Sequence, residues 1–565
     1  MDTVKSFRGY GKVDELEEAA FRRKTRKRII IISISVSLLL ILIIGVVAGT
    51  VAHSKNKNSS GKAPATSSSA IKSICSVTQY PDSCSTSLSS ANSTNPEKIF
   101  QFSLMVVMDS LQKVSTLPAE YMNRTDNPLV KEALNVCGTV LNDAVESLND
   151  TVSAAGGKFA SRIDDLKTWL STVVTDQETC FDALEEANAT FVEEIKQLMK
   201  NSTEFASNSL AIVNKLLGFL GDFKIPIHRR LLAAPGSGFP TWVAAADRRL
   251  LQENNRKPDV TVAADGSGDV RTIAEAVAKI PKKSDTRFVI YIKAGVYVEN
   301  VVLDKSYWNV MIYGDGKNST IISGSKNFVD GTPTFSTATF AVAGRGFIAQ
   351  DIGFKNTAGA AKHQAVAFRS GSDQSVFYRC LFDAFQDTLY AHSNRQFYRE
   401  CDITGTIDFI FGNSAVVFQN CSIFPRQPLP NQFVTITAQG KKDPNQNTGI
   451  SIQRCTMRPL DNLTAPTYLG RPWKEYSVTV IMESNIGGFL NPKGWISWVP
   501  NVDPPSSIFY AEYKNIGPGA NTGKRVTWAG YKPIITADQA SKYNVESFIE
   551  GSSWLPTANV AYDST

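Results

Sequence analysis

Two aspartates separated by 21 residues are the first candidates for chemistry in this sequence. Asp387 and Asp408 have the same spacing as Cys380 and Cys401, which belong to a repeated pattern. If equivalent positions of that repeat stack, the two carboxyl groups lie about 5 Å apart. Two carboxylates that close cannot both ionise easily, so the pKa of one rises. The pair would then supply an acid and a base or nucleophile at neutral pH.

The residues around the aspartates leave two interpretations open. Asp408 lies in the segment DFIFG at 408–412, and Asp387 lies between Gln386 and an apolar pair. Gln364 precedes Asp387 by 23 residues, which would place it one coil further back. On these residue types alone, a catalytic pair and two structural turn aspartates are both admissible.

The repeat that would position these residues has a period near 20. It recurs as YRCLF at 378–382, YRECDI at 398–403, FQNCSI at 418–423 and IQRCTM at 452–457. Short apolar runs alternate with Gly, Asn and Asp throughout this region, and helical periodicity is nearly absent. Short strands and turns at such a period indicate a solenoid of stacked coils. The sequence therefore predicts an all-β module over residues 259–565.

The eight cysteines fall into two groups of four. Cys401 and Cys421 would lie on adjacent coils, close enough to form a disulfide if their side chains face each other. The alternative is a buried ladder of apolar cysteines, which we favour for Cys380 and Cys455. Spacing alone does not give the pairing of the first group, which comprises Cys75, Cys84, Cys137 and Cys180.

Three segments lie between residue 52 and the β module. Residues 53–70 are rich in Ser, Lys and Ala and are interpreted as a stalk. Residues 71–225 have apolar residues at helical spacing, which predicts a small helical bundle. Residues 226–258 contain clustered Pro and Gly and form a predicted linker. The linker carries RRLL at 229–232 and again at 248–251. This duplication favours proteolytic processing over two solvated charge pairs.

Residues 29–52 form an uncharged run of 24 residues, long enough to cross a bilayer core of about 30 Å. The tail 1–28 places six Lys and Arg residues just before this run, which predicts a cytosolic N-terminus and a luminal remainder. We favour a signal anchor over a cleaved signal peptide, because the run is longer than a usual signal core. Nine Asn-x-Ser/Thr sequons agree with passage through the secretory pathway.

Composition excludes several other functions. The net charge of +6 is too small to indicate a nucleic-acid binder, and no zinc-finger spacing is present. The sequence has four His, none of them paired at metal-ligand spacing, which argues against a zinc hydrolase or a His-based triad. Acidic residues outnumber basic ones over 53–228, whereas basic residues outnumber acidic ones over 252–565.

Five motifs in order give the β module a family resemblance. They are GVYVE at 295–299, QAVA at 364–367, QDTL at 386–389, DFIFG at 408–412 and LGRPW at 469–473. With them, the chain resembles plant pectin methylesterases that carry an N-terminal inhibitor-like region. The resemblance implies a right-handed parallel β-helix that removes methyl esters from homogalacturonan, releases methanol and needs no cofactor.

The resemblance also implies residue roles. Asp408 would attack the methyl-ester carbonyl, and Asp387 would donate a proton to the leaving methanol and later accept one from water. Gln386 and Gln364 would donate amide hydrogen bonds to the oxyanion. Three further residues would serve the substrate: Arg471 by holding Asp408 ionised and oriented, Trp473 by packing against a sugar ring, and Thr334 by touching the substrate.

The helical segment resembles the pectin methylesterase inhibitor domain, a four-helix bundle. That resemblance implies the disulfides Cys75–Cys84 and Cys137–Cys180. It also implies that the helical domain covers the cleft or aids folding until a luminal protease cuts an RRLL site, after which the mature enzyme reaches the cell wall. Separate inhibitor proteins are a further class of partner.

Three rival functions remain open. A polygalacturonase would use paired carboxylates to protonate a glycosidic oxygen. A pectate lyase would need a calcium site, and the sequence has no dense Asp cluster of that kind. An interaction protein would pair an inhibitory helical domain with an inert β module.

Overall fold

The computed structural model describes residues 66–222 and 257–564, apart from positions 158 and 559. The tail 1–28, the apolar run 29–52, most of the stalk 53–70 and both RRLL sites lie outside the described residues. Within the described ranges, no helix has the length and apolar character needed to cross a membrane.

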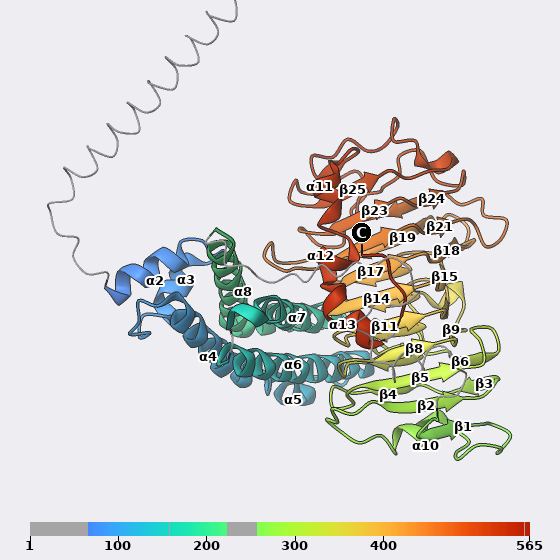
Figure 1. Cartoon of the computed structure of the whole chain (residues 1–565), viewed down its shortest axis with the longest axis horizontal. Helices are drawn as coiled ribbons and strands as arrows, with labels where there is room; N and C mark the ends of the chain where they lie inside the picture. Colours follow the sequence, from blue (N-terminus) through green and yellow to red (C-terminus); the bar gives the residue numbers. More distant parts are fainter. Residues whose placement is uncertain (1–65, 158, 223–256, 559, 565) are drawn as a thin grey trace, which may run out of the picture. The chain divides into compact units, whose positions relative to one another are not determined.

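The N-terminal domain is helical, and its four long helices confirm the predicted bundle (Figure 1). Its elements are α2 (Ser67–Cys75), α3 (Pro81–Ser87), α4 (Pro96–Val114), α5 (Leu117–Tyr121), η1 (Met122–Arg124), α6 (Pro128–Ala155), α7 (Phe159–Glu186) and α8 (Val192–Asp222). Helices α4 and α6 begin with the same signal, an Asn side chain that accepts backbone N–H groups, followed by Pro at the first helical position.

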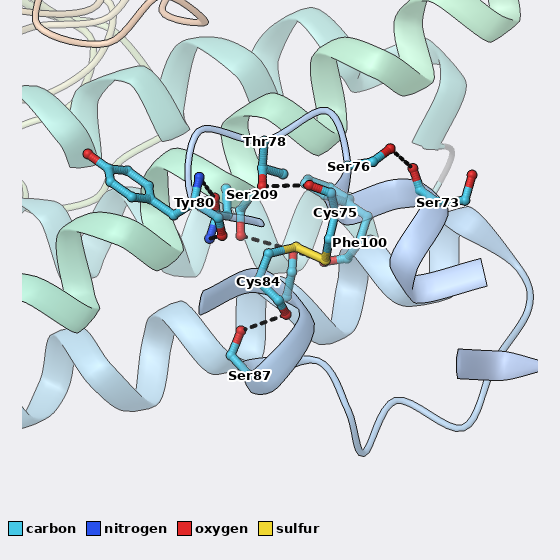
Figure 2. Close-up of a disulfide and its surroundings, with 11 residues drawn as sticks. Ser73, Cys75, Ser76, Thr78, Tyr80, Cys84, Ser87, Phe100 and Ser209 are labelled. Carbon is cyan, nitrogen blue, oxygen red and sulfur yellow. Dashed lines mark hydrogen bonds between the residues drawn. A yellow bond between two sulfur atoms is a disulfide. The ribbon is translucent and has the colours of Figure 1, made fainter. Parts of the chain in front are cut away.

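Two disulfides fix this domain, and both match the predicted pairs. Cys75–Cys84 joins α2 to α3, as Figure 2 shows, and Cys137–Cys180 joins α6 to α7. Helix α2 begins at Ser67, inside the segment predicted as stalk. The reason is that Ile71 and Cys75, one turn apart on one face of α2, are buried in the core of the bundle.

The second domain is built from three parallel sheets, which confirms a parallel β-helix. Sheet A contains, in spatial order, β1 (Val260–Val262), β2 (Phe288–Ile292), β5 (Val310–Gly314), β8 (Ile348–Gln350), β11 (Ser375–Tyr378), β14 (Arg395–Arg399), β17 (Ala415–Gln419), β20 (Gly449–Gln453), β23 (Val478–Met482), β25 (Phe509–Tyr513) and β26 (Tyr531–Lys532). Figure 1 shows strands β5, β8, β11, β14 and β17 of sheet A stacked in this order.

Sheets B and C run in the same way along the other sides of the coils. Sheet B contains β24 (Asn485–Ile486), β21 (Thr456–Met457), β18 (Ser422–Pro425), β15 (Asp402–Gly405), β12 (Leu381–Asp383), β9 (Gly353–Asn356), β6 (Thr320–Gly324) and β3 (Gly295–Val298). Sheet C contains β22 (Thr467–Gly470), β19 (Val434–Gln439), β16 (Ile410–Gly412), β13 (Leu389–Ala391), β10 (Phe368–Ser370), β7 (Phe340–Val342) and β4 (Val301–Leu303).

The register explains the repeat seen in the sequence. Leu389 pairs with Ile410 between β13 and β16, a separation of 21 residues, so similar side chains stack from coil to coil. The interior is filled in this way by aromatic ladders, such as Phe377 on Tyr398, whose ring centroids lie 4.3 Å apart. Stacked rings of this kind add to the free energy gained by burying them.

The predicted Cys401–Cys421 disulfide is wrong for this structure, where both residues are free and buried together with Cys380 and Cys455. Side chains at equivalent positions of parallel, in-register strands point in the same direction, so the two thiols stack on adjacent coils without a bond between their sulfur atoms. Each thiol instead lies against a backbone carbonyl of the preceding coil: the Sγ of Cys401 is 3.4 Å from the oxygen of Phe377. The cysteine-ladder alternative therefore holds for all four.

Short elements complete the second domain. They are α10 (Ile273–Val277), η2 (Thr334–Ser336), η3 (Ala360–Lys362), η4 (Pro518–Ala520), α11 (Ala537–Ser541), α12 (Val545–Ile549) and α13 (Gly551–Ala558). Residues of α12 and α13 pack on the outer face of sheet A, where Val545 and Trp554 join Val417 in one buried cluster. The Glu299 carboxylate accepts N–H groups at the start of α10, so this residue supports the fold.

Candidate active site

Asp387 and Asp408 occupy equivalent positions, each two residues before a strand of sheet C. Because β13 and β16 pair in register, the coil repeat brings the two aspartates to adjacent coils, as predicted. Both have a left-handed backbone conformation, with φ of 63° for Asp387 and 51° for Asp408. Asp is one of the few residues that adopts this conformation readily, and such backbone geometry is common at functional sites.

Asp408 is held by two neighbouring strands. Arg471 directly follows β22. Its guanidinium group donates two hydrogen bonds to Asp408, from Nε to Oδ1 at 2.9 Å and from Nη2 to Oδ2 at 2.6 Å. From β19, the Thr435 hydroxyl donates to the same Oδ1 at 2.6 Å and accepts the Asp408 N–H at 2.8 Å. Burial opposes the charge on Arg471, but Asp408 outweighs it and raises the pKa of Arg471. This bidentate, charge-assisted geometry fixes the orientation of the Asp408 carboxylate.

Asp387 is in the opposite electrostatic state. Its side chain is buried, and burial together with the charges of Asp408 and Glu186 raises its pKa well above the usual value of a carboxyl group. The Arg471 charge works against this rise but does not cancel it. A carboxyl group with a raised pKa therefore lies beside an ion-paired carboxylate, which is the contrast between the two groups that their spacing predicted.

The two glutamines lie next to this pair. A parallel bridge joins Gln364 to Gln386, so these residues also stack on adjacent coils. Neither side-chain amide hydrogen-bonds to another residue in the described part of the chain, and the Gln364 Oε1 is buried without a partner. Amide groups left free at this position are available to a ligand in the cleft.

Aromatic rings line the cleft on the side of β16 and the 469–473 motif. Tyr390 stacks on Phe411 with ring centroids 4.2 Å apart, and Phe411 lies 6.3 Å from Trp473. Trp473 in turn stacks on Trp498 at 6.3 Å, and the Arg471 guanidinium lies 4.2 Å from the Trp498 ring. Such a surface suits the apolar faces of sugar rings.

Sequence reasoning missed Thr435 and Trp498. Thr435 lies in the regular strand pattern VTIT, where nothing separates a residue that holds Asp408 from one that packs in a sheet. Trp498 lies 25 positions beyond Trp473 in a loop outside the repeat, so no periodic argument could place it. The spacing of Asp387, Asp408 and Gln364, by contrast, follows the coil period.

The helical domain covers this cleft. Its buried apolar core continues onto the cleft side of the β-helix, where it includes Phe335, Ala338, Ala341, Val366, Tyr390, Phe411 and Ala438. Polar contacts surround this core: Glu186 of α7 accepts the Thr334 N–H at 3.0 Å, and Ser207 of α8 donates to Asp443 at 2.5 Å. Thr334, which was predicted to touch the substrate, is thus hydrogen-bonded to Glu186 of the same chain.

Comparison with known proteins agrees with this geometry. The pectinesterase model matches residues 259–552, and the model for plant invertase/pectin methylesterase inhibitor matches residues 69–212. The chain is 60% identical to pectinesterase 3 of Phaseolus vulgaris, with 100% of each chain covered. It is 59% identical to pectinesterase 1 of Arabidopsis thaliana, with 99% of each covered.

A solved structure extends the comparison to three dimensions. The pectin methylesterase from carrot is 53% identical, with a TM-score of 0.54. The alignment covers 55% of this chain and 99% of the carrot chain. The stacked aspartates, the matched family models and these relatives lead to one conclusion: the chain belongs to the pectinesterase family, and its catalytic module follows a domain of the pectin methylesterase inhibitor type.

Proposed function

We propose that the chain hydrolyses the methyl esters of homogalacturonan with Asp408 as nucleophile and Asp387 as general acid and base. A carboxylate oxygen of Asp408 attacks the C6 carbonyl carbon and forms a tetrahedral oxyanion. The oxyanion collapses, the bond to the methoxy oxygen breaks, and Asp387 gives its proton to the departing methanol. Water then attacks the acyl-enzyme, Asp387 takes a proton back, and a free galacturonate carboxylate leaves.

The observation that carries this proposal is the contrast between the two carboxyl groups. Arg471 and Thr435 orient the carboxylate of Asp408, while burial raises the pKa of Asp387 and keeps it a proton donor. Gln386 and Gln364 would donate their free amides to the oxyanion, a type of contact worth about 3–4 kcal/mol in other esterases and proteases. Trp473 would hold the sugar ring next to the ester.

The helical domain supports a second part of the proposal, autoinhibition. Because Glu186 occupies Thr334 and the apolar core closes over Tyr390 and Phe411, a polysaccharide cannot reach the cleft while the helical domain stays in place. We expect cleavage of the linker 226–258 at one of its RRLL sites to release the enzyme. We further propose that residues 29–52 anchor the precursor in the secretory pathway, and that the mature module is secreted to the cell wall.

Product analysis tests the reaction. Residues 257–565 are incubated with highly methylated pectin, and methanol and chain length are measured in the same sample. The proposal expects methanol without chain shortening. Shortened chains without methanol would mean that the carboxyl pair cuts glycosidic bonds, and neither product from folded protein would favour the interaction-protein alternative.

A further inference from the structure

A row of residues at the end of sheet C joins Asn413 to Trp473 across three successive coils. Asn413 follows β16, Gly440 follows β19, and Trp473 lies three residues after β22. Backbone hydrogen bonds connect these coils, since the Gly440 N–H donates to the carbonyl of Gly412 and the Trp473 N–H donates to that of Gln439. Because adjacent coils are about 4.8 Å apart, the backbone of Asn413 lies about 10 Å from that of Trp473. A ligand must therefore extend beyond a sugar ring held at Trp473 to reach Asn413.

Gly440 keeps the floor between these two residues flat. A Cβ atom at this position would lie 2.7 Å from Cε3 of Trp473, so only glycine lets the indole ring rest against the backbone. The ring thus leans from its own coil toward the coil of Asn413, and no side chain at position 440 stands between them. A polymer that packs on Trp473 can continue along this row.

Asn413 and Gln446 place two side-chain amides at the end of the row, and the catalytic module itself holds their oxygens. The Oδ1 of Asn413 accepts hydrogen bonds from Gln439 Nε2 at 3.0 Å and from the Thr448 hydroxyl at 2.6 Å. The Oε1 of Gln446 accepts two backbone N–H groups of its own loop, 440–448, at 3.1 and 3.2 Å. It also accepts one N–H of the Asn413 amide at 3.2 Å. These contacts fix the direction of both NH₂ groups without the helical domain.

Both NH₂ groups donate to one hydroxyl of the helical domain. The Thr175 Oγ1 of α7 accepts Asn413 Nδ2 at 2.9 Å and Gln446 Nε2 at 3.1 Å. Gln446 donates its other N–H to the Ser171 carbonyl at 2.9 Å, and the Thr175 hydroxyl donates its proton to the same carbonyl. Asn413, Gln446 and Thr175 are each at most 5% exposed. When the helical domain leaves, three N–H groups lose their acceptors but keep their orientation.

We infer that Asn413 and Gln446 form a subsite for a ring hydroxyl of a galacturonan unit beyond the unit at Trp473, and that the Thr175 hydroxyl occupies this subsite in the uncleaved chain. The inference rests on the proposed function. A sugar hydroxyl can accept two hydrogen bonds and donate one, as the Thr175 hydroxyl does. Because the two donors are already oriented, binding costs little side-chain entropy. Esterified and free units carry the same ring hydroxyls, so the subsite selects for chain length and not for methylation.

Kinetics on oligomers of increasing length test this inference. The module 257–565 suits the experiment, because 99% of the carrot chain aligns with only 55% of this chain, which is the length of that module. We measure kcat/KM of wild type, Q446E and N413D on fully methylated oligogalacturonides of two to six units. Both substitutions keep the oxygen that accepts hydrogen bonds and replace the donating NH₂ group with a second oxygen. The substrates are neutral, so the new charge has no carboxylate to repel.

The two variants should change the dependence on length. For each we expect kcat/KM on the hexamer to fall about fivefold, as for the loss of one neutral hydrogen bond, while the value on the dimer changes less than twofold. Q539E is the matched control, because the exposed Gln539 also uses its Oε1 to accept a backbone N–H, that of Thr536 at 2.9 Å. It should leave the values at every length as in wild type.

The pattern across lengths separates a substrate contact from a structural role. An equal fall at every length, in variants whose circular dichroism matches wild type, would overturn the inference. Hexamer values within twofold of wild type for both variants would overturn it as well. If the wild-type module released no methanol from any oligomer, the proposed function would fail instead.

Discussion

Replacing Arg471 with methionine would remove the only guanidinium that contacts Asp408 in the described part of the chain while keeping much of the side-chain volume. The guanidinium now bonds to both carboxylate oxygens at 2.9 and 2.6 Å, and the Asp408 side chain is only 7% exposed. Breaking a pair buried to this degree costs about 3–5 kcal/mol, because the remaining charge is left unpaired.

This free energy is lost in the step in which the Asp408 carboxylate attacks the ester carbonyl. A loss of about 3–4 kcal/mol in the transition state lowers kcat by about 10²–10³-fold. R471K keeps the positive charge but loses the planar guanidinium group that binds both carboxylate oxygens. Its kcat should therefore lie between that of wild type and that of R471M.

The assay is methanol release by the module across pH 4–9, with circular dichroism as the control for folding. The reasoning would be refuted by a folded R471M variant whose kcat stays within fivefold of wild type. Equal activity of R471K and R471M would also contradict it, since the charge alone would then contribute nothing.

Three further predictions follow from the described contacts. Because burial raises the pKa of Asp387, its contribution favours the folded state at low pH and is lost as pH rises through the folded pKa. D387N should therefore raise the Tm by about 2–4 °C at pH 7 and by less at pH 4, as measured by calorimetry; an equal change at both pH values would count against a buried acid. In the uncleaved chain, D182N combined with E186Q removes two contacts that hold the helical domain on the cleft, and methanol release should rise at least tenfold; no rise would show that the apolar core alone keeps the cleft closed. Since Cys421 is free, C421S should shift the midpoint of urea unfolding of the module equally with and without a reductant; a loss of stability on reduction of wild type alone would restore the predicted Cys401–Cys421 disulfide.

The sequence predicts the parts of the site that obey the coil period. Asp387, Asp408 and Gln364 follow from a repeat of about 20 residues, because parallel in-register strands convert equal spacing into neighbouring positions. The roles of Arg471, Trp473 and Thr334 came from family resemblance instead, since no periodic argument links them to the aspartates.

Other features depend on side-chain direction, which spacing does not encode. Cys401 and Cys421 stack as predicted, yet their sulfur atoms point the same way and meet backbone carbonyls. Spacing also fails to predict the role of Thr435. Its hydroxyl donates to Asp408 from a strand whose sequence is typical of ordinary β structure. Asp182 and Glu186 on α7 have the spacing of a solvated helix face. Only the structure shows that Asp182 contacts Lys474 and that Glu186 contacts Thr334.

The central claim is that Asp408 is the nucleophile, and the D408N variant of the module tests it most directly. An amide of the same shape cannot attack the ester, so methanol release from highly methylated pectin should fall at least 10³-fold in protein whose circular dichroism matches wild type. Methanol release within tenfold of wild type would remove Asp408 from the role assigned to it and leave the mechanism without its first step.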